Sequence, residues 1–185
     1  MVASRRVPRG YAGAVEAAPR GVRGGQYVAD PEADEVVVFL IGMRINRLRR
    51  VRSWWPTFTG MPRMLAELSK EDLGLLGYRI FRSGRVFLVV QYWRSAAELG
   101  AYARDSSKLH APAWGAFNEQ SARTGDVGIF HETYVVPRSA IETVYGNMPA
   151  FGLGDAVGSV ERSAFGDHNE ARRKMQCTEP EYVEG

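Results

Sequence analysis

The sequence predicts an α+β fold, a ferredoxin-like βαββαβ unit of the kind that forms a dimeric α/β barrel. Three apolar runs, at residues 35–46, 85–93 and 126–136, alternate with helical stretches. One such unit covers only one face of its sheet with helices, so the other face is expected to be buried by something else, often a second copy. The predicted parts are an N-terminal tail over 1–34, partly disordered, the ferredoxin-like domain over 35–155, and a charged extension over 156–185.

The first predicted strand, residues 35–46, is apolar on both faces until it reaches Arg44 and Asn46. These two residues share one face and mark the outgoing end of the strand. A basic connection follows at residues 47–52, which we interpret as a solvated loop. Ser53 is the expected N-cap of the next helix. Gly60 and Pro62 are expected to interrupt this helix and to start a second helical segment.

The second half of the predicted unit begins with a hairpin around residues 83–84, between strands at 75–82 and 85–93. Ser95 and Glu98 have the spacing of a capping box and predict a helix start. This helix is expected to break near residues 105–108 and to resume over 110–123. Gly125 and Asp126 then turn the chain into the last strand.

Composition describes an ordinary globular protein, with 45% hydrophobic and 24% charged residues and a formal net charge of +3. Basic residues do not interleave with stacking aromatic residues, so we expect no nucleic-acid partner. The longest apolar run, 36–43, is far too short to span a bilayer, so we expect no membrane partner. The single cysteine, Cys177, forms no internal disulfide and supplies no cysteine-rich metal site. We therefore expect a cytoplasmic protein without a metal.

Several linked motifs resemble a family of monooxygenase-like domains of the fumagillin-pathway type. They are FLIGMRIN, SWWP, MPRML, QYWRS, AYARD, a helical His-x-x-x-Trp, GDVGIFHETY and NMPAFGLG, within about residues 26–155. The resemblance implies the dimeric α/β-barrel fold, shared with antibiotic-biosynthesis monooxygenases and more distantly with haem-degrading monooxygenases, chlorite dismutases and aldoxime dehydratases. Cofactor-free oxygenases and haem-degrading enzymes of this superfamily use an asparagine on their first strand, which Asn46 resembles in placement.

The candidate catalytic residues are Asn46, Arg44 and His131. An amide and a guanidinium at a strand end can stabilise a substrate oxyanion, although both can equally be solvated or salt-bridged. His131 shares its strand face with Val127, Ile129 and Thr133, while Glu132 lies on the opposite face. An imidazole on a buried face can act as a general base, a ligand, or a hydrogen-bonded core residue.

The candidate substrate-binding residues are aromatic or amide side chains of the second half: Gln91, Trp93, Tyr102 and Trp114. The alternative for each aromatic residue is plain core packing. His110 and His131 are the candidate haem ligands. Haem-degrading relatives carry a helix tryptophan ten positions before their histidine, and Gly100 stands there in this chain.

Three functional hypotheses follow from these residues. The first is a monooxygenase-like, cofactor-independent enzyme that oxidises an aromatic or polycyclic small molecule as a homodimer. The second is a haem-binding enzyme of the same fold, resembling aldoxime dehydratases or haem-degrading enzymes. The third is a small-molecule-binding dimer without catalysis.

Overall fold

The computed structural model describes residues 18–109, 115 and 124–162, and these form parts of two compact units. Residues 31–141 make the central unit, and residues 1–30 with 142–185 make the terminal unit. Among the described residues, no helix has both the length and the apolar character needed to cross a membrane.

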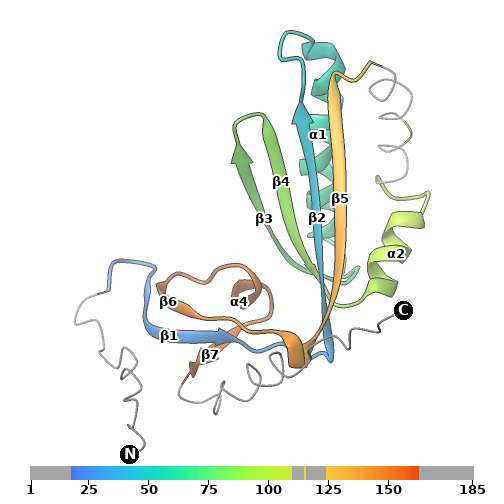
Figure 1. Ribbon diagram of the computed structural model, residues 1–185. Coiled ribbons are helices and arrows are strands. Elements are labelled where there is room, and N and C mark those ends of the chain that lie inside the picture. Colours follow the sequence, from blue (N-terminus) through green and yellow to red (C-terminus); the bar gives the residue numbers. More distant parts are fainter. Residues whose placement is uncertain (1–17, 110–114, 116–123, 163–185) are drawn as a thin grey trace, which may run out of the picture. The chain divides into compact units, whose positions relative to one another are not determined.

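The central unit is the predicted βαββαβ unit, which confirms the fold class (Figure 1). Its four strands form one antiparallel sheet in the order β3-β4-β2-β5, so the first and third strands of the unit lie in the middle. The hairpin at Gly84, which has a φ of 56°, joins β3 to β4 as predicted. The elements are β2 (Glu35–Ile45), α1 (Val51–Leu68), β3 (Leu75–Ser83), β4 (Val86–Trp93), α2 (Ala96–Arg104), β5 (Val127–Pro137) and the 3₁₀ turn η1 (Arg138–Ala140).

Helix α1 differs from its prediction in two ways. It runs without interruption through Pro56 and Pro62, where we expected a break and a new segment. Both prolines lie at exposed positions, where water can hydrate the carbonyl oxygens that a missing N–H leaves unbonded. The helix begins at Val51, before the expected cap at Ser53, and no side chain caps it. The second helix starts as predicted, because the Ser95 Oγ accepts a hydrogen bond from the Glu98 N–H at 3.2 Å.

Both helices pack on one face of the sheet, which we call the helix face. The buried side chains of this face form two clusters. The first joins Leu68 and Tyr102 of the helices to Val37 and Trp93 of the strands. The second, at the other end of β2, contains Met43, Ile45 and Val127 with Trp54, Phe58, Phe87 and Ile129 packed against it. The opposite face, which we call the open face, carries the alternate residues of each strand.

The terminal unit contains a second antiparallel sheet, in the order β6-β1-β7, together with the short helix α4. We predicted residues 1–34 as a tail, but residues 23–29 form the middle strand of this sheet. The segment contains two glycines and no apolar alternation, so no period marked it as a strand. The elements are β1 (Arg23–Ala29), β6 (Tyr145–Met148), α4 (Leu153–Ala156) and β7 (Ser159–Glu161).

Candidate functional site

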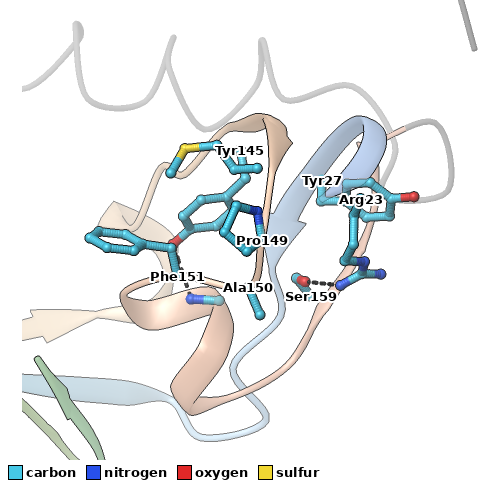
Figure 2. Close-up of a pocket in the computed structure, with 9 residues that line it drawn as sticks. Arg23, Tyr27, Tyr145, Pro149, Ala150, Phe151 and Ser159 are labelled. Carbon is cyan, nitrogen blue, oxygen red and sulfur yellow. Dashed lines mark hydrogen bonds between the residues drawn. The ribbon is translucent and has the colours of Figure 1, made fainter. Parts of the chain in front are cut away.

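The hollow found in the terminal unit is lined by side chains that already bond to one another (Figure 2). The Arg23 guanidinium lies 4.0 Å from the centroid of the Tyr27 ring, and its Nη1 donates to the Ser159 Oγ at 2.7 Å. The Tyr145 hydroxyl accepts a hydrogen bond from the Gly154 N–H at 3.0 Å. A Cβ on Gly154 would lie 2.7 Å from the Tyr145 ring, so glycine is needed there. These contacts hold the last glycine of the NMPAFGLG segment against Tyr145 and occupy the polar groups of Arg23 and Ser159.

The central unit places the two predicted strand-end residues on the open face. The guanidinium of Arg44 donates to the Asn46 Oδ1, and the Asn46 Nδ2 donates to the Gly125 carbonyl at 3.0 Å. The backbone N–H of Asn46 also donates to the Asp126 carbonyl, at 2.9 Å. The two side chains therefore come together as expected, but their polar atoms join the end of β2 to the turn before β5.

Asp126 lies in the turn before β5 and takes part in the same set of contacts with the end of β2. Its carboxylate is buried and accepts from the Arg47 Nη1 at 2.9 Å. The pKa of Asp126 is lowered: burial of the carboxylate opposes this shift, but hydrogen bonds from Ser53, Arg47 and Thr124 outweigh it. Ser53, predicted as a helix cap, thus bonds to Asp126 instead of to the start of α1. Together these contacts fix the entry of α1 against the start of β5.

His131 lies on the helix face, whereas Asn46 and Arg44, with which we grouped it as a catalytic set, lie on the open face. In the antiparallel register His131 is opposite Ile41, and its ring centroid is 5.9 Å from that of Phe39. Arg44 and Asn46 occupy the other parity of the same strand, so their side chains leave the opposite face of the sheet. Within one chain, His131 and the Arg44–Asn46 pair therefore face opposite sides of the sheet.

Gln91 is also on the helix face, buried to 4% exposure in the middle of β4. Its Oε1 accepts a hydrogen bond from the Trp93 Nε1 at 2.8 Å. The structure gives the Gln91 Nε2 no hydrogen-bond partner among the residues it describes. A buried amide donor without a partner costs free energy, so this atom is a place where a ligand or a water can bind.

Trp93 and Tyr102, which we predicted to bind substrate, are buried in the first cluster. Trp93 is only 1% exposed, and its ring lies 5.9 Å from that of Tyr102. The Tyr102 hydroxyl donates to the Glu67 Oε2 at 3.1 Å. Burial and the neighbouring Glu67 carboxylate raise the pKa of Tyr102 well above its ordinary value. Near the candidate site, Trp93 supports Gln91, because its indole N–H holds the Gln91 side-chain oxygen.

The remaining predicted site residues, His110 and Trp114, lie outside the described residues. Sequence reasoning missed Phe39, whose ring stands beside His131 on the neighbouring strand. It also missed a pair on the open face, where the Tyr134 hydroxyl donates to the Glu132 Oε2 at 2.6 Å. This hydrogen bond raises the pKa of Tyr134. The signal for the pair was available, because residues two apart on a strand share a face.

The candidate site is thus the stretch of helix face that runs from buried Gln91 past half-buried Phe39 to the exposed His131. The register across β4, β2 and β5 puts Gln91 opposite Phe39, and Phe39 opposite Thr133, with His131 one pair further along. Phe39 therefore lies between Gln91 and His131 on one face. Among residues 18–109, 115 and 124–162, no group of three or more His, Cys, Asp or Glu side chains is placed to hold a metal ion.

A family model described as Monooxygenase af470-like matches residues 36–153. The chain belongs to this family. The match confirms the resemblance drawn from the motifs, and it covers the βαββαβ unit from Val36 onward and the NMPAF segment.

Known relatives of the family domain include monooxygenase af470 of Aspergillus fumigatus, which is 27% identical over 140 residues. That alignment covers 70% of this chain but 49% of the relative, so the chain spans about half the length of the relative. Two solved structures are also similar. SnoaB from Streptomyces nogalater, a cofactor-independent oxygenase, is 12% identical with a TM-score of 0.40 over 55% of this chain and 92% of that chain. A conserved protein from Bacteroides thetaiotaomicron is 19% identical with a TM-score of 0.39 over 56% and 99%.

Proposed function

We propose that this family member is a monooxygenase-type oxidoreductase that oxidises an aromatic or polycyclic small molecule without a bound cofactor. Its site is the helix-face stretch of Gln91, Phe39 and His131. The observation that carries the proposal is the buried Gln91 amide, whose Nε2 has no partner among the described residues and which shares its face with an imidazole. Membership of a monooxygenase-like family supports the class of reaction.

An aromatic substrate fits the order of side chains across the face. Gln91 and His131 stand on strands that flank β2 and are shifted by two residues along it, so their backbones are about 12 Å apart. The Phe39 ring between them offers a surface against which a planar ring can stack. A molecule of two or three fused rings on Phe39 would then present one oxygen toward Gln91 and an acidic C–H or O–H toward His131.

The proposed mechanism uses the two polar groups at the ends of this surface. His131 accepts the proton of an acidic substrate CH₂ group, and the Gln91 Nε2 donates to the oxygen that takes up the negative charge. The substrate carbanion gives its electrons to dioxygen and forms a C–O bond, which yields a hydroperoxide. Loss of water from the hydroperoxide leaves a carbonyl, so that CH₂ and O₂ become C=O and H₂O. The substrate itself is the reductant in this balance.

In this proposal Gln91 takes the oxyanion-stabilising role first assigned to Asn46 and Arg44. Those two residues hold the end of β2 to the turn at residues 125–126. Their substitution should lower stability more than it lowers the rate of chemistry. Trp93 acts as a positioning residue, because its indole N–H fixes the Gln91 carbonyl oxygen.

The open face is proposed to be covered by a second copy of the chain. Three aromatic side chains of this face are more than one-third exposed in the single chain: Phe81, Phe130 and Tyr134. Burying such a face in a homodimer would complete the α/β barrel implied by the fold. The molecular mass in solution tests this part of the proposal, since a monomeric mass at micromolar concentration contradicts it.

The enzyme activity is tested with dithranol, an anthrone whose CH₂ group can be oxidised to a carbonyl, and with a set of phenols and anthrones. Oxygen uptake above the chemical blank is expected. His131→Gln should lower the rate by about 10²–10⁴-fold, the usual contribution of a general base. Glu132→Gln, one residue away on the open face, is the matched control and should keep most of the rate.

The competing haem hypothesis has its own readout in the same samples. Addition of hemin should leave the protein without a specific Soret band. A Soret band that His131→Gln abolishes would overturn the cofactor-free proposal and favour the haem-binding enzyme. Oxygen uptake no faster than the blank with every compound would favour the binding dimer without catalysis.

A further inference from the structure

The entry of α1 carries an exposed apolar and basic surface that the proposed reaction does not use. We call it the α1 entry patch and define it as Leu48, Val51 and Trp55 with Arg49, Arg50 and Arg52. The three apolar side chains are 50%, 49% and 52% exposed, and all three arginines are exposed. The patch lies beyond the end of β2, where the loop leads into α1 (Figure 1).

The composition of this patch does not serve the stability of the helix. The first turn of α1 contains no acidic residue, and no side chain caps its N-terminus. Positive charge near a helix N-terminus opposes the helix dipole. Arg49, Arg50 and Arg52 form no ion pair with any residue of the described chain. Three cations without an ion pair in the described part of the chain, set around three exposed apolar side chains, lower the stability of the fold, and an anionic partner would offset this loss.

Contacts of Trp54 and Arg47 nevertheless fix the backbone of the patch. The Trp54 Nε1 donates to the Leu48 carbonyl at 3.0 Å, which fixes the loop against the helix. Arg47 anchors the same loop through its ion pair with Asp126 at 2.9 Å. The Trp55 ring packs beside the Trp54 ring, with centroids 5.8 Å apart. These contacts present Leu48 and Trp55 outward in a fixed arrangement, so little conformational entropy is lost when they bind.

We propose that the α1 entry patch docks the protein on an anionic lipid surface. Tryptophan and aliphatic side chains enter the headgroup region, while guanidinium groups around them bind lipid phosphates. A partner helix would need a groove, whereas these side chains project from the start of a helix and its loop. We expected no membrane partner because no run can span a bilayer, but surface binding needs no span. Helix α1, which carries Val51, Arg52 and Trp55 of the patch, packs on the face opposite to the one proposed for the second copy.

The test is co-sedimentation of the full chain with vesicles. Binding is expected to vesicles of phosphatidylcholine mixed with phosphatidylserine, to fall as salt is raised, and to be weak with phosphatidylcholine alone. Combined substitution R49Q, R50Q and R52Q should lower the partition constant about a hundredfold, at roughly fivefold for each basic residue. W55S should weaken binding further without changing the salt dependence.

The matched control removes the same charge elsewhere, at the exposed residues Arg20, Arg82 and Arg104. The R20Q, R82Q and R104Q variant should keep most of the binding. Equal loss in both triple variants would overturn the proposal, because binding would then follow net charge alone. Failure to bind the anionic vesicles, or binding to an acidic polypeptide such as polyglutamate in their place, would overturn it as well. Circular dichroism and the unfolding midpoint of each variant separate lost binding from lost folding.

Discussion

The two faces of the central sheet differ in how their side chains are satisfied. On the helix face, side chains pack in two clusters toward the ends of β2. Gln91 is buried on this face, Phe39 packs against the first cluster, and His131 is exposed beside Phe39. On the open face, the aromatic residues Phe81 and Phe130 stand exposed without a covering helix. One face thus buries its side chains under its own helices, and the other leaves aromatic side chains exposed. The difference shows that strand parity decides which polar side chains project from the same face of the sheet.

The largest expected effect contrasts one aromatic residue from each face. Trp93→Ala removes a fully buried ring from the first cluster and should lower the free energy of unfolding by about 3–5 kcal/mol. Phe130→Ala removes a partly exposed ring and should cost about 1–2 kcal/mol. Urea unfolding of dilute protein measures both. Equal losses would show that the open face is as well buried as the helix face.

The stability losses of Phe130→Ala and Trp93→Ala should also depend differently on protein concentration. If a second copy covers the open face, the loss caused by Phe130→Ala grows with concentration, because dimer formation is linked to folding. The loss caused by Trp93→Ala should stay constant.

The next effect concerns the tightest backbone approach on the open face. A Cβ on Gly42 would lie 2.5 Å from the Phe130 ring and 2.7 Å from the Phe87 carbonyl oxygen. Gly42→Ala should therefore cost about 1–3 kcal/mol, as overpacking usually does. Adding Phe130→Ala should recover only part of this loss, since the carbonyl clash remains.

A glycine without such neighbours is the control for that substitution. Gly60 lies inside α1 with open space around its Cα. Gly60→Ala should stabilise the protein by about 0.5–1 kcal/mol, because alanine favours the helix. A stabilising Gly42→Ala would mean that β2 and Phe130 can separate.

A smaller effect tests the polar support of the helix face. Tyr102→Phe removes the hydrogen bond to Glu67 and keeps the ring, so the expected loss is about 0.5–1.5 kcal/mol. The Leu109 N–H still donates to the same carboxylate, which limits the loss. Thermal unfolding measures the change, and the oxygen-uptake rate should remain. A strong loss of rate with normal stability would make Tyr102 part of the site after all.

The sequence predicted the parts of the fold that periodicity and turn residues encode. The three apolar runs, the hairpin at Gly84 and the cap at Ser95 are local signals, and the structure confirms each of them. The parity of the last strand was also available, and it placed His131 and Glu132 on opposite faces. Parity within one strand did not predict which residues of neighbouring strands share a face of the sheet.

That step needs the register between strands, which no local pattern gives. From the sequence alone, Arg44 and His131 are compatible with a single site. The pairing of Ile41 with His131 places them on opposite faces of the sheet. The engagement of Asn46 with Gly125 is likewise a contact over 79 positions. Trp93 and Tyr102 were assigned to substrate because an aromatic side chain in a core and one in a pocket give the same sequence pattern.

The last prediction concerns Asp126, which joins the turn before β5 to the loop that leads into α1. Its folded-state pKa is lowered below the ordinary value of 3.8, so its contribution to stability is present at neutral pH. That contribution is lost as the pH falls below about 4 and through the folded-state pKa. Asp126→Asn should destabilise the protein at pH 7, and the difference from the original chain should shrink in acid. Unfolding midpoints at both pH values measure this. A difference that stays constant with pH would show that the hydrogen bonds to Ser53 and Arg47 hold the turn and the loop together through geometry, with the charge contributing nothing.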